Sequence, residues 1–554
     1  MTTLALRRLR RLDGSDLALM TGVSVWAVGL FALRIGLVHP AVDRLYLDIL
    51  GYGTPIVLCF AAFLRRGEPG VLPLAAGFSA CVILALALDV AASRQPKIAY
   101  AIPAGVLAGV ITVRRPAASL ITLFALTGFY GSIMAFTPLP ADSMTSWITE
   151  ALWVGVLGRL VLNRELPAVR VTPALVLIAA VMVLSIGSAL TTSPVGNGVT
   201  ALKLAPQVLS LVLLIGCSGF RARDLDLFAR AIVVICLLVD AYAALRWAIG
   251  PAAKEAQLSG IGQARQYNTI AHTNETKLQG SFRNGNSLGL WLACTTPFVV
   301  AAVLSWRGTM RIVALMTLPV AAIALFGSGQ RTATAAVFAG ILAVVVVHVV
   351  SRGYRGPRLG VAGATIVALI VSAAVVYPAV VDSPEKRQRY SDLLRPSRDP
   401  SFQERREKWR QTIHDLRGHP FGYGLGSGNS LADRRFKTIA ARDIDNSYLM
   451  VAWEQGLAVG VLFVVAMVAL LLELLRHAVW TRGPGGAAST AAVGVLVAIM
   501  VEFATANYIV YPVMIAGWLA VGLGVAALNR VPLHTRSRTS SSPDTRLGPA
   551  PALR

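Results

Sequence analysis

The feature that most constrains this chain is a succession of apolar stretches, each long enough to cross a lipid bilayer. A hydrocarbon core of about 30 Å needs about 20 apolar residues in a helix, and sheet edges are not satisfied in lipid, so the stretches predict transmembrane helices. Several are short, and we therefore expect about 14–16 spans. The sixteen candidates are residues 17–38, 45–64, 71–92, 98–113, 117–136, 147–162, 172–190, 203–219, 225–249, 287–305, 312–327, 332–350, 359–381, 447–475, 487–506 and 511–528.

The composition agrees with a protein of the bilayer. Hydrophobic residues make up 55% of the 554 residues and charged residues 14%, and the mean hydropathy is +0.64. An ordinary globular protein carries about 25% charged residues. These values exclude a disordered chain. The five cysteines lie in apolar runs without Cys-x-x-Cys spacing, which excludes a disulfide scaffold.

Arginines in alternate short loops predict the orientation. The net charge is +23, and the excess gathers in pairs such as Arg65 and Arg66, or Arg221 and Arg223, on one predicted side of the membrane. Cytoplasmic loops carry such an excess. The arginines before the first span and after the last lie on the same side. Both termini are therefore predicted to be cytoplasmic.

We expect a transmembrane helical domain, residues 1–534, and a disordered basic cytoplasmic tail, residues 535–554, which is rich in Ser, Pro and Arg. The long polar segment 382–446 then lies outside the cytoplasm as a candidate catalytic loop. It carries fourteen Lys/Arg and ten Asp/Glu. A loop of this length indicates function or disorder.

The loop contains a helix signal. Ser401 and Glu404 form a capping box, and Trp409, Ile413 and Leu416 follow at helical spacing. The pattern predicts an amphipathic helix over residues 402–417, lying on the outer membrane surface.

Four polar clusters fall on the predicted outer side. The first is Gly-Ser-Phe-Arg-Asn-Gly-Asn at 280–286, and the second is Ser-Gly-Gln-Arg-Thr at 328–332. The third combines Arg405, Arg406 and Trp409 with a glycine-rich run, and the fourth runs from Asp443 to Leu449 and continues through Glu-Gln-Gly at 454–456.

Taken together, the clusters resemble the O-antigen ligase and O-antigen polymerase superfamily of bacterial envelope glycosyltransferases. The resemblance covers roughly residues 280–460, and rests on the order of the clusters and on the ten-residue step from Trp409 to His419 before a Gly-x-Gly-x-Gly turn. Members are all-α polytopic proteins, similar to GT-C glycosyltransferases, with a large periplasmic loop between two late spans. The resemblance implies inverting, metal-independent transfer of a glycan from a polyprenyl diphosphate to an acceptor hydroxyl, at the outer face of the bacterial inner membrane.

By this resemblance, Arg331 and Arg405 match the family's two functional arginines. Breaking a glycosyl–phosphate bond places negative charge on a diphosphate, which a preorganised guanidinium stabilises. The alternatives are that Arg331 snorkels to lipid headgroups and that Arg405 is a solvated charge of the loop helix. If the alignment with the family's motif is shifted by one residue, Arg406 takes the role given to Arg405.

The acceptor hydroxyl needs a base, and the family has His-Asn where this chain has Asp445-Asn446. An ionised aspartate accepts a proton, so Asp445 is the predicted general base. Alternatively, it caps the helix that begins near Ser447 or pairs with loop arginines. The missing histidine slightly favours a polymerase or exopolysaccharide-type member over a ligase.

Other residues have subsidiary predictions. No metal or cofactor is expected, since the seven histidines show no His-Glu-x-x-His or Cys/His pairing. The glycines of 422–428 predict a backbone that bends tightly or approaches a ligand. Glu502 is a candidate lining of an acceptor groove, and Asp240 is expected to pair with a neighbouring helix. The residues predicted to contact substrates are Arg283, Asn286, Arg406, Trp409, Asn446 and Tyr448.

The rival class is a lipid-linked glycan flippase or another polytopic transporter, in which Asp89, Asp240 and Glu502 form a coupling path. Transporters commonly show two similar halves with broken helices at the midplane. Here the polar residues gather on one face, which favours the enzyme. The expected partners are the polyprenyl-diphosphate-linked glycan donor, a glycan or lipid acceptor and the bilayer, with no nucleic acid.

Overall fold

The computed structural model describes residues 116–136, 149, 171–192, 198, 201–202, 206–217, 220–253, 255–256, 277–352, 363, 375–381, 384–391, 400–428, 444–481, 484–506 and 512–529. The four candidate spans before residue 116, the span 147–162, most of 359–381 and the tail 535–554 lie outside these ranges. So do Asp89 and Asp443.

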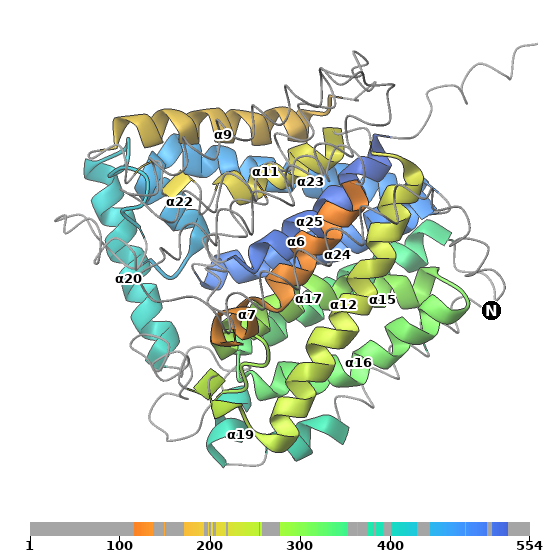
Figure 1. Ribbon diagram of the computed structural model, residues 1–554. Coiled ribbons are helices and arrows are strands. Elements are labelled where there is room, and N and C mark those ends of the chain that lie inside the picture. Colours follow the sequence, from red (N-terminus) through yellow and green to blue (C-terminus); the bar gives the residue numbers. More distant parts are fainter. Residues whose placement is uncertain are drawn as a thin grey trace, which may run out of the picture.

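The described part is helical throughout, without a strand (Figure 1). Seven of its helices are long and apolar enough to cross a membrane, and an eighth crossing is counted if α6 and α7 form one span. The predicted all-α polytopic class is confirmed. The helices are α6 (Pro116–Gly128), α7 (Tyr130–Phe136), α9 (Pro173–Thr191), α11 (Pro206–Cys217), α12 (Ala222–Ile249), α15 (Gly285–Ser305), α16 (Thr309–Gly327), α17 (Arg331–Arg352), α19 (Pro384–Ser391), α20 (Pro400–Gly418), α22 (Ser447–Gln455), α23 (Leu457–Trp480), α24 (Pro484–Thr505) and α25 (Met514–Leu528).

Two predicted spans are broken. The run 117–136 bends by 72° between α6 and α7, where Gly131 lies against the backbone of Phe282. The run 447–475, expected as one span, is divided at Gly456, whose φ of 96° ends α22 before α23 begins. Both breaks lie where a glycine allows another segment to approach the helix, which apolar periodicity does not reveal.

Helix α15 forms the centre of the described bundle, and its whole apolar window is buried. It packs against α16, α17, α24 and α25. Helices α9 and α23 are buried on one side only and expose large apolar side chains, such as Leu190 and Val461, on the other. Such faces suit an environment of lipid or of other helices, since lipid tails are as apolar as the side chains.

Close packing of α15, α17 and α24 depends on small residues. A Cβ on Gly494 would lie 2.3 Å from Val344 Cγ2 and 2.9 Å from the carbonyl oxygen of Gly340. Small residues let helix backbones approach in this way inside a bilayer. The resulting contact between α17 and α24 places the start of α17 beside the end of α24.

Helix α20 lies across one end of the bundle (Figure 1). It confirms the helix predicted over residues 402–417, although it begins at Pro400, so that Ser401 lies inside the helix. Thr412 and Leu416 are buried, whereas Ile413, predicted on the apolar face, is 45% exposed. The buried side contacts α22, which brings the loop helix against the start of the following segment.

The break at Gly456 gives a test of the fold. In Gly456→Ala, the new Cβ would lie 2.8 Å from the Pro420 carbonyl oxygen, at a positive φ. We expect a loss of about 1–3 kcal/mol of stability, measured as a lower thermal unfolding temperature of the purified protein in detergent. Gly418→Ala is the control, because a Cβ on Gly418 meets nothing within 4 Å. Equal unfolding temperatures for the two variants would contradict the described break.

Candidate functional site

The site is assembled around the C-terminal end of α24. Asn446 Nδ2 donates to the carbonyl oxygen of residue 504 at 2.8 Å, Arg405 Nη1 to that of residue 505 at 2.8 Å, and Ser447 Oγ to that of residue 506 at 2.9 Å. The last carbonyls of a helix have no partner within the helix. The carbonyls of residues 504 and 505 at the end of the helix, and that of residue 506 just beyond it, are satisfied here by side chains from the third and fourth polar clusters.

Arg405 and Asp445, predicted as catalytic partners from distant parts of the chain, lie side by side. Arg405 Nε is 3.7 Å from Asp445 Oδ2, and the two side chains are 32% and 34% exposed. One turn further along α20, Trp409 Nε1 donates to the backbone carbonyl of Asp445 at 3.3 Å. The helix thus holds the aspartate by its side chain and by its backbone, and leaves about a third of the side chain exposed.

The two residues that follow Asp445 have positioning contacts. Asn446 caps α22, since its Oδ1 accepts from the backbone N–H of Leu449 at 3.0 Å while its Nδ2 is bonded to α24. The Tyr448 hydroxyl donates to the carbonyl of Met500 at 3.1 Å. Burial raises the pKa of Tyr448 to about 12, so the phenol stays neutral. The helix cap considered for Asp445 is therefore supplied by Asn446.

The first and second clusters also meet, at the starts of α15 and α17. The backbone N–H of Leu278 donates to the carbonyl of Gly327 at 2.9 Å. A Cβ on Gly289 would lie 2.7 Å from Gln330 Cβ, so the first turns of the two helices are in contact. Arg331 begins α17 and is partly buried. Beside it, Asn286 accepts from Lys277 Nζ at 3.2 Å, and Arg283 is partly buried in the same loop.

Glu502 lies between the two groups. Its carboxylate faces the Thr332 hydroxyl without reaching hydrogen-bond geometry, and it is within electrostatic range of Arg405. The side chain is fully buried, and neither oxygen has a hydrogen-bond partner among the described residues. Arg405 and Asp445 are thus in contact, whereas Arg331 lies on the neighbouring helix at the same end of the bundle.

The glycine-rich run closes around the end of α22. Tyr423 stacks on Trp453 with ring centroids 4.1 Å apart, and the backbone N–H of Gly424 donates to the carbonyl of Glu454 at 3.0 Å. The N–H of Gly428 donates to Glu454 Oε1 at 3.0 Å. Gly422, Gly424 and Gly426 all have positive φ. The close approach predicted from these glycines is made to a buried carboxylate of the same chain.

Two other charged residues, Asp240 and Arg406, have contrasting surroundings. Asp240 accepts from Trp291 Nε1 of α15 at 3.2 Å, as expected for a buried acid that pairs with a neighbouring helix. Arg406, the alternative to Arg405, is exposed on α20. No group of three or more metal-ligating side chains occurs in the ranges that the structure describes.

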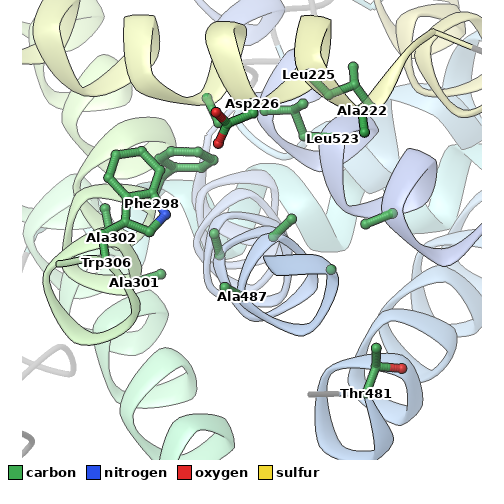
Figure 2. Close-up of a pocket in the computed structure, with 15 residues that line it drawn as sticks. Ala222, Leu225, Asp226, Phe298, Ala301, Ala302, Trp306, Thr481, Ala487 and Leu523 are labelled. Carbon is green, nitrogen blue, oxygen red and sulfur yellow. The ribbon is translucent and has the colours of Figure 1, made fainter. Parts of the chain in front are cut away.

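A cavity of about 440 Å³ lies at the other end of the bundle (Figure 2). Its walls are mainly apolar and include Ala222 at the start of α12, Trp306 after α15 and Ala487 near the start of α24. These positions are at the opposite ends of the helices from Arg405 and Asp445. The cavity is therefore separate from the candidate site.

Fold and site together define a polytopic helical membrane protein with a charged site at one end of its bundle, assembled by a long loop. Residues 312–464 match the model of the O-antigen ligase family. The resemblance to the O-antigen ligase and polymerase superfamily is confirmed over this segment, which includes Arg331, Arg405 and Asp445 but begins after the cluster at 280–286. No curated protein matches the chain.

Sequence reasoning missed the carboxylate of Glu454 and the ammonium of Lys277. Glu454 had a signal, because it lies in the Glu-Gln-Gly triplet of the fourth cluster, but no local pattern connects that triplet to glycines 26 residues earlier. Lys277 precedes the first cluster by three residues, and only the docking of this segment on the turn before Arg331 brings it to the site.

The buried carboxyl of Glu454, which accepts from the Gly428 N–H, predicts a pH dependence of stability. Burial raises the pKa of Glu454 from 4.5 to about 7. The folded protein holds this proton more tightly than the unfolded chain, so the stabilisation is present at low pH and is lost as pH rises through about 7. Glu454→Gln has no proton to lose and retains an acceptor for Gly428. Between about pH 5 and pH 8, its unfolding temperature should fall less than that of the wild type.

The matched control is Glu407→Gln, on the exposed face of α20, which should follow the wild-type profile. If the unfolding temperatures of the wild type and Glu454→Gln change in parallel with pH, the Glu454 carboxyl does not titrate in this range.

Proposed function

We propose that this protein transfers a glycan from a polyprenyl diphosphate to an acceptor hydroxyl at the extracytoplasmic membrane face, as an O-antigen polymerase or ligase. The observation that carries the proposal is the contact between Arg405 and Asp445 within a segment that matches the O-antigen ligase family. Its location in the bacterial inner membrane, with both termini in the cytoplasm, belongs to the same proposal.

In the proposed reaction, Asp445 removes the proton of the acceptor hydroxyl, and the hydroxyl oxygen attacks the anomeric carbon of the donor sugar. The bond between this carbon and the diphosphate oxygen breaks, and its electron pair leaves with polyprenyl diphosphate. Attack opposite the leaving group inverts the anomeric configuration. The partial exposure of the Asp445 side chain supports this role, because a base must reach the proton that it removes.

Arg331 and Arg405 are proposed to hold the diphosphate. Guanidinium groups stabilise the developing negative charge most strongly where water is scarce and their positions are fixed. Arg405 meets the second condition, since it is held by the carbonyl of Thr505 and by Asp445. The partial burial of Arg331 and Arg405 supports the first. The reaction proposed here uses no metal.

Arg406 and Trp409 are proposed to lie along the bound glycan, and Asn446 and Tyr448 to maintain the floor of the site. The exposure of Arg406 supports a contact with a substrate in the aqueous phase. Arg283 and Asn286 are proposed to act with Arg331, on the donor side. A polymerase would accept a second carrier-linked glycan here, and a ligase would accept a different hydroxyl.

The test is release of polyprenyl diphosphate by purified protein supplied with a polyprenyl-diphosphate-linked oligosaccharide and an acceptor. Asp445→Asn should lower the turnover by about 10²–10⁴-fold through loss of the base. Arg405→Ala should lower it by about 10²–10³-fold through loss of the cation. Asp445→Asn should keep the wild-type unfolding temperature within a few degrees. Arg405→Ala also removes the hydrogen bond to the Thr505 carbonyl, so it should unfold at a lower temperature, and its turnover is measured well below that temperature.

Arg410→Ala serves as the matched control, since this arginine lies on the exposed side of the same helix, paired with Glu407. Movement of intact lipid-linked glycan across vesicles without release of diphosphate would instead indicate the transporter class. Full activity of Asp445→Asn would show that Asp445 is not the general base.

A further inference from the structure

The segment before the first cluster is fixed against the turn that leads into α17. The Leu278 N–H bonds to the Gly327 carbonyl at 2.9 Å, and a Cβ on Gly327 would lie 2.8 Å from Leu278 Cδ2. With its neighbour held in this way, Lys277 lies over Gly329, where its Cγ is 3.5 Å from the position of an added Cβ. The stem of the lysine therefore crosses the turn two residues before Arg331.

The ammonium of Lys277 lies at the start of α15. It donates to Asn286 Oδ1 at 3.2 Å, and Asn286 is the second residue of that helix. The first turns of α15 and α17 are in contact. One small region therefore contains the lysine, Arg331 and the positive ends of two helix dipoles. Such an arrangement favours a ligand with more than one negative charge.

We propose that Lys277 binds the diphosphate of the lipid-linked donor together with Arg331, as a third cation of the site. The inference rests on the proposed function and extends it to a residue outside the family match at 312–464. The Asn286 amide oxygen is a neutral acceptor, and a phosphate oxygen makes a stronger, charge-assisted hydrogen bond with an ammonium. Lysine suits this position as a flexible point charge, whereas a guanidinium makes fixed bidentate contacts.

The experiment separates donor binding from the remainder of the reaction. Lys277→Met keeps an unbranched stem over Gly329 and removes the charge. We expect its KM for the lipid-linked donor to rise about tenfold or more, the effect of losing one charge-assisted contact. The KM for the acceptor should be unchanged, and kcat should change by less than about threefold. Lys277→Arg should recover most of the donor affinity.

Inorganic pyrophosphate provides a second measurement that a merely structural role would not change. It should inhibit the wild type in competition with the donor, and its inhibition constant should rise in Lys277→Met in parallel with the donor KM. A rise for the donor alone would indicate that the lysine contacts the sugar or the lipid and would overturn the assignment to the diphosphate.

The matched control is Lys408→Met, because Lys408 is a partly exposed lysine of α20 paired with Glu404 at 2.8 Å. It should leave the donor KM and the pyrophosphate inhibition unchanged. If Lys277→Met does not fold, Lys277→Gln, which retains donors for Asn286, is measured in its place. Wild-type values in either folded variant would overturn the inference.

The failure of this inference is distinguishable from failure of the proposed function. A wild-type protein that releases polyprenyl diphosphate, combined with an unchanged lysine variant, removes Lys277 alone. A wild-type protein that releases none under the same conditions removes the transfer reaction, and the donor role of Lys277 with it.

Discussion

The arrangement of the site depends on how the last carbonyl groups of α24 are satisfied. A helix that ends within or beside a bilayer has few water molecules for its terminal carbonyls, and each one left without a partner costs several kcal/mol. Three consecutive carbonyls receive hydrogen bonds from Asn446, Arg405 and Ser447. The contacts that complete the helix are thus the same contacts that bring the long loop to the bundle. The hydrogen bonds that complete the helix end therefore also hold the site together.

Much of this arrangement could be predicted because it depends on local patterns. Apolar runs of sufficient length predict the spans, and the spacing of Trp409 and Leu416 predicts α20. The exposure of Ile413 shows the limit, because which side of a short amphipathic helix is covered depends on a partner elsewhere in the chain. The breaks at Gly131 and Gly456 have the same origin. In each case a second segment approaches the glycine, and neither segment alone contains the information.

The resemblance assigned Arg405 and Asp445 to one reaction, and pairing with a loop arginine was the alternative considered for Asp445. The two residues are 40 positions apart, and no periodicity connects them. What could not be predicted is which of the neighbouring residues make structural hydrogen bonds. Asn446 was predicted to contact a substrate, but both ends of its amide are used to cap α22 and α24. Its structural contacts leave Asp445, one residue earlier, free of capping and accessible. Adjacent residues of one short motif thus have separate tasks, and only the hydrogen bonds distinguish them.

The carboxyl groups of Asp445, Glu454 and Glu502 lie near this end of the bundle, and the surroundings of the three differ. Glu454 is enclosed by the glycine run and bonded to the Gly428 N–H, so no substrate reaches it. Glu502 is fully buried within electrostatic range of Arg405, so no substrate reaches it either. Asp445 alone combines exposure with a neighbouring cation. In the proposed reaction this cation has two consequences, because it orients the carboxylate and also lies beside the charge that the leaving diphosphate develops. A single contact at the end of α24 thus connects the base to the leaving group.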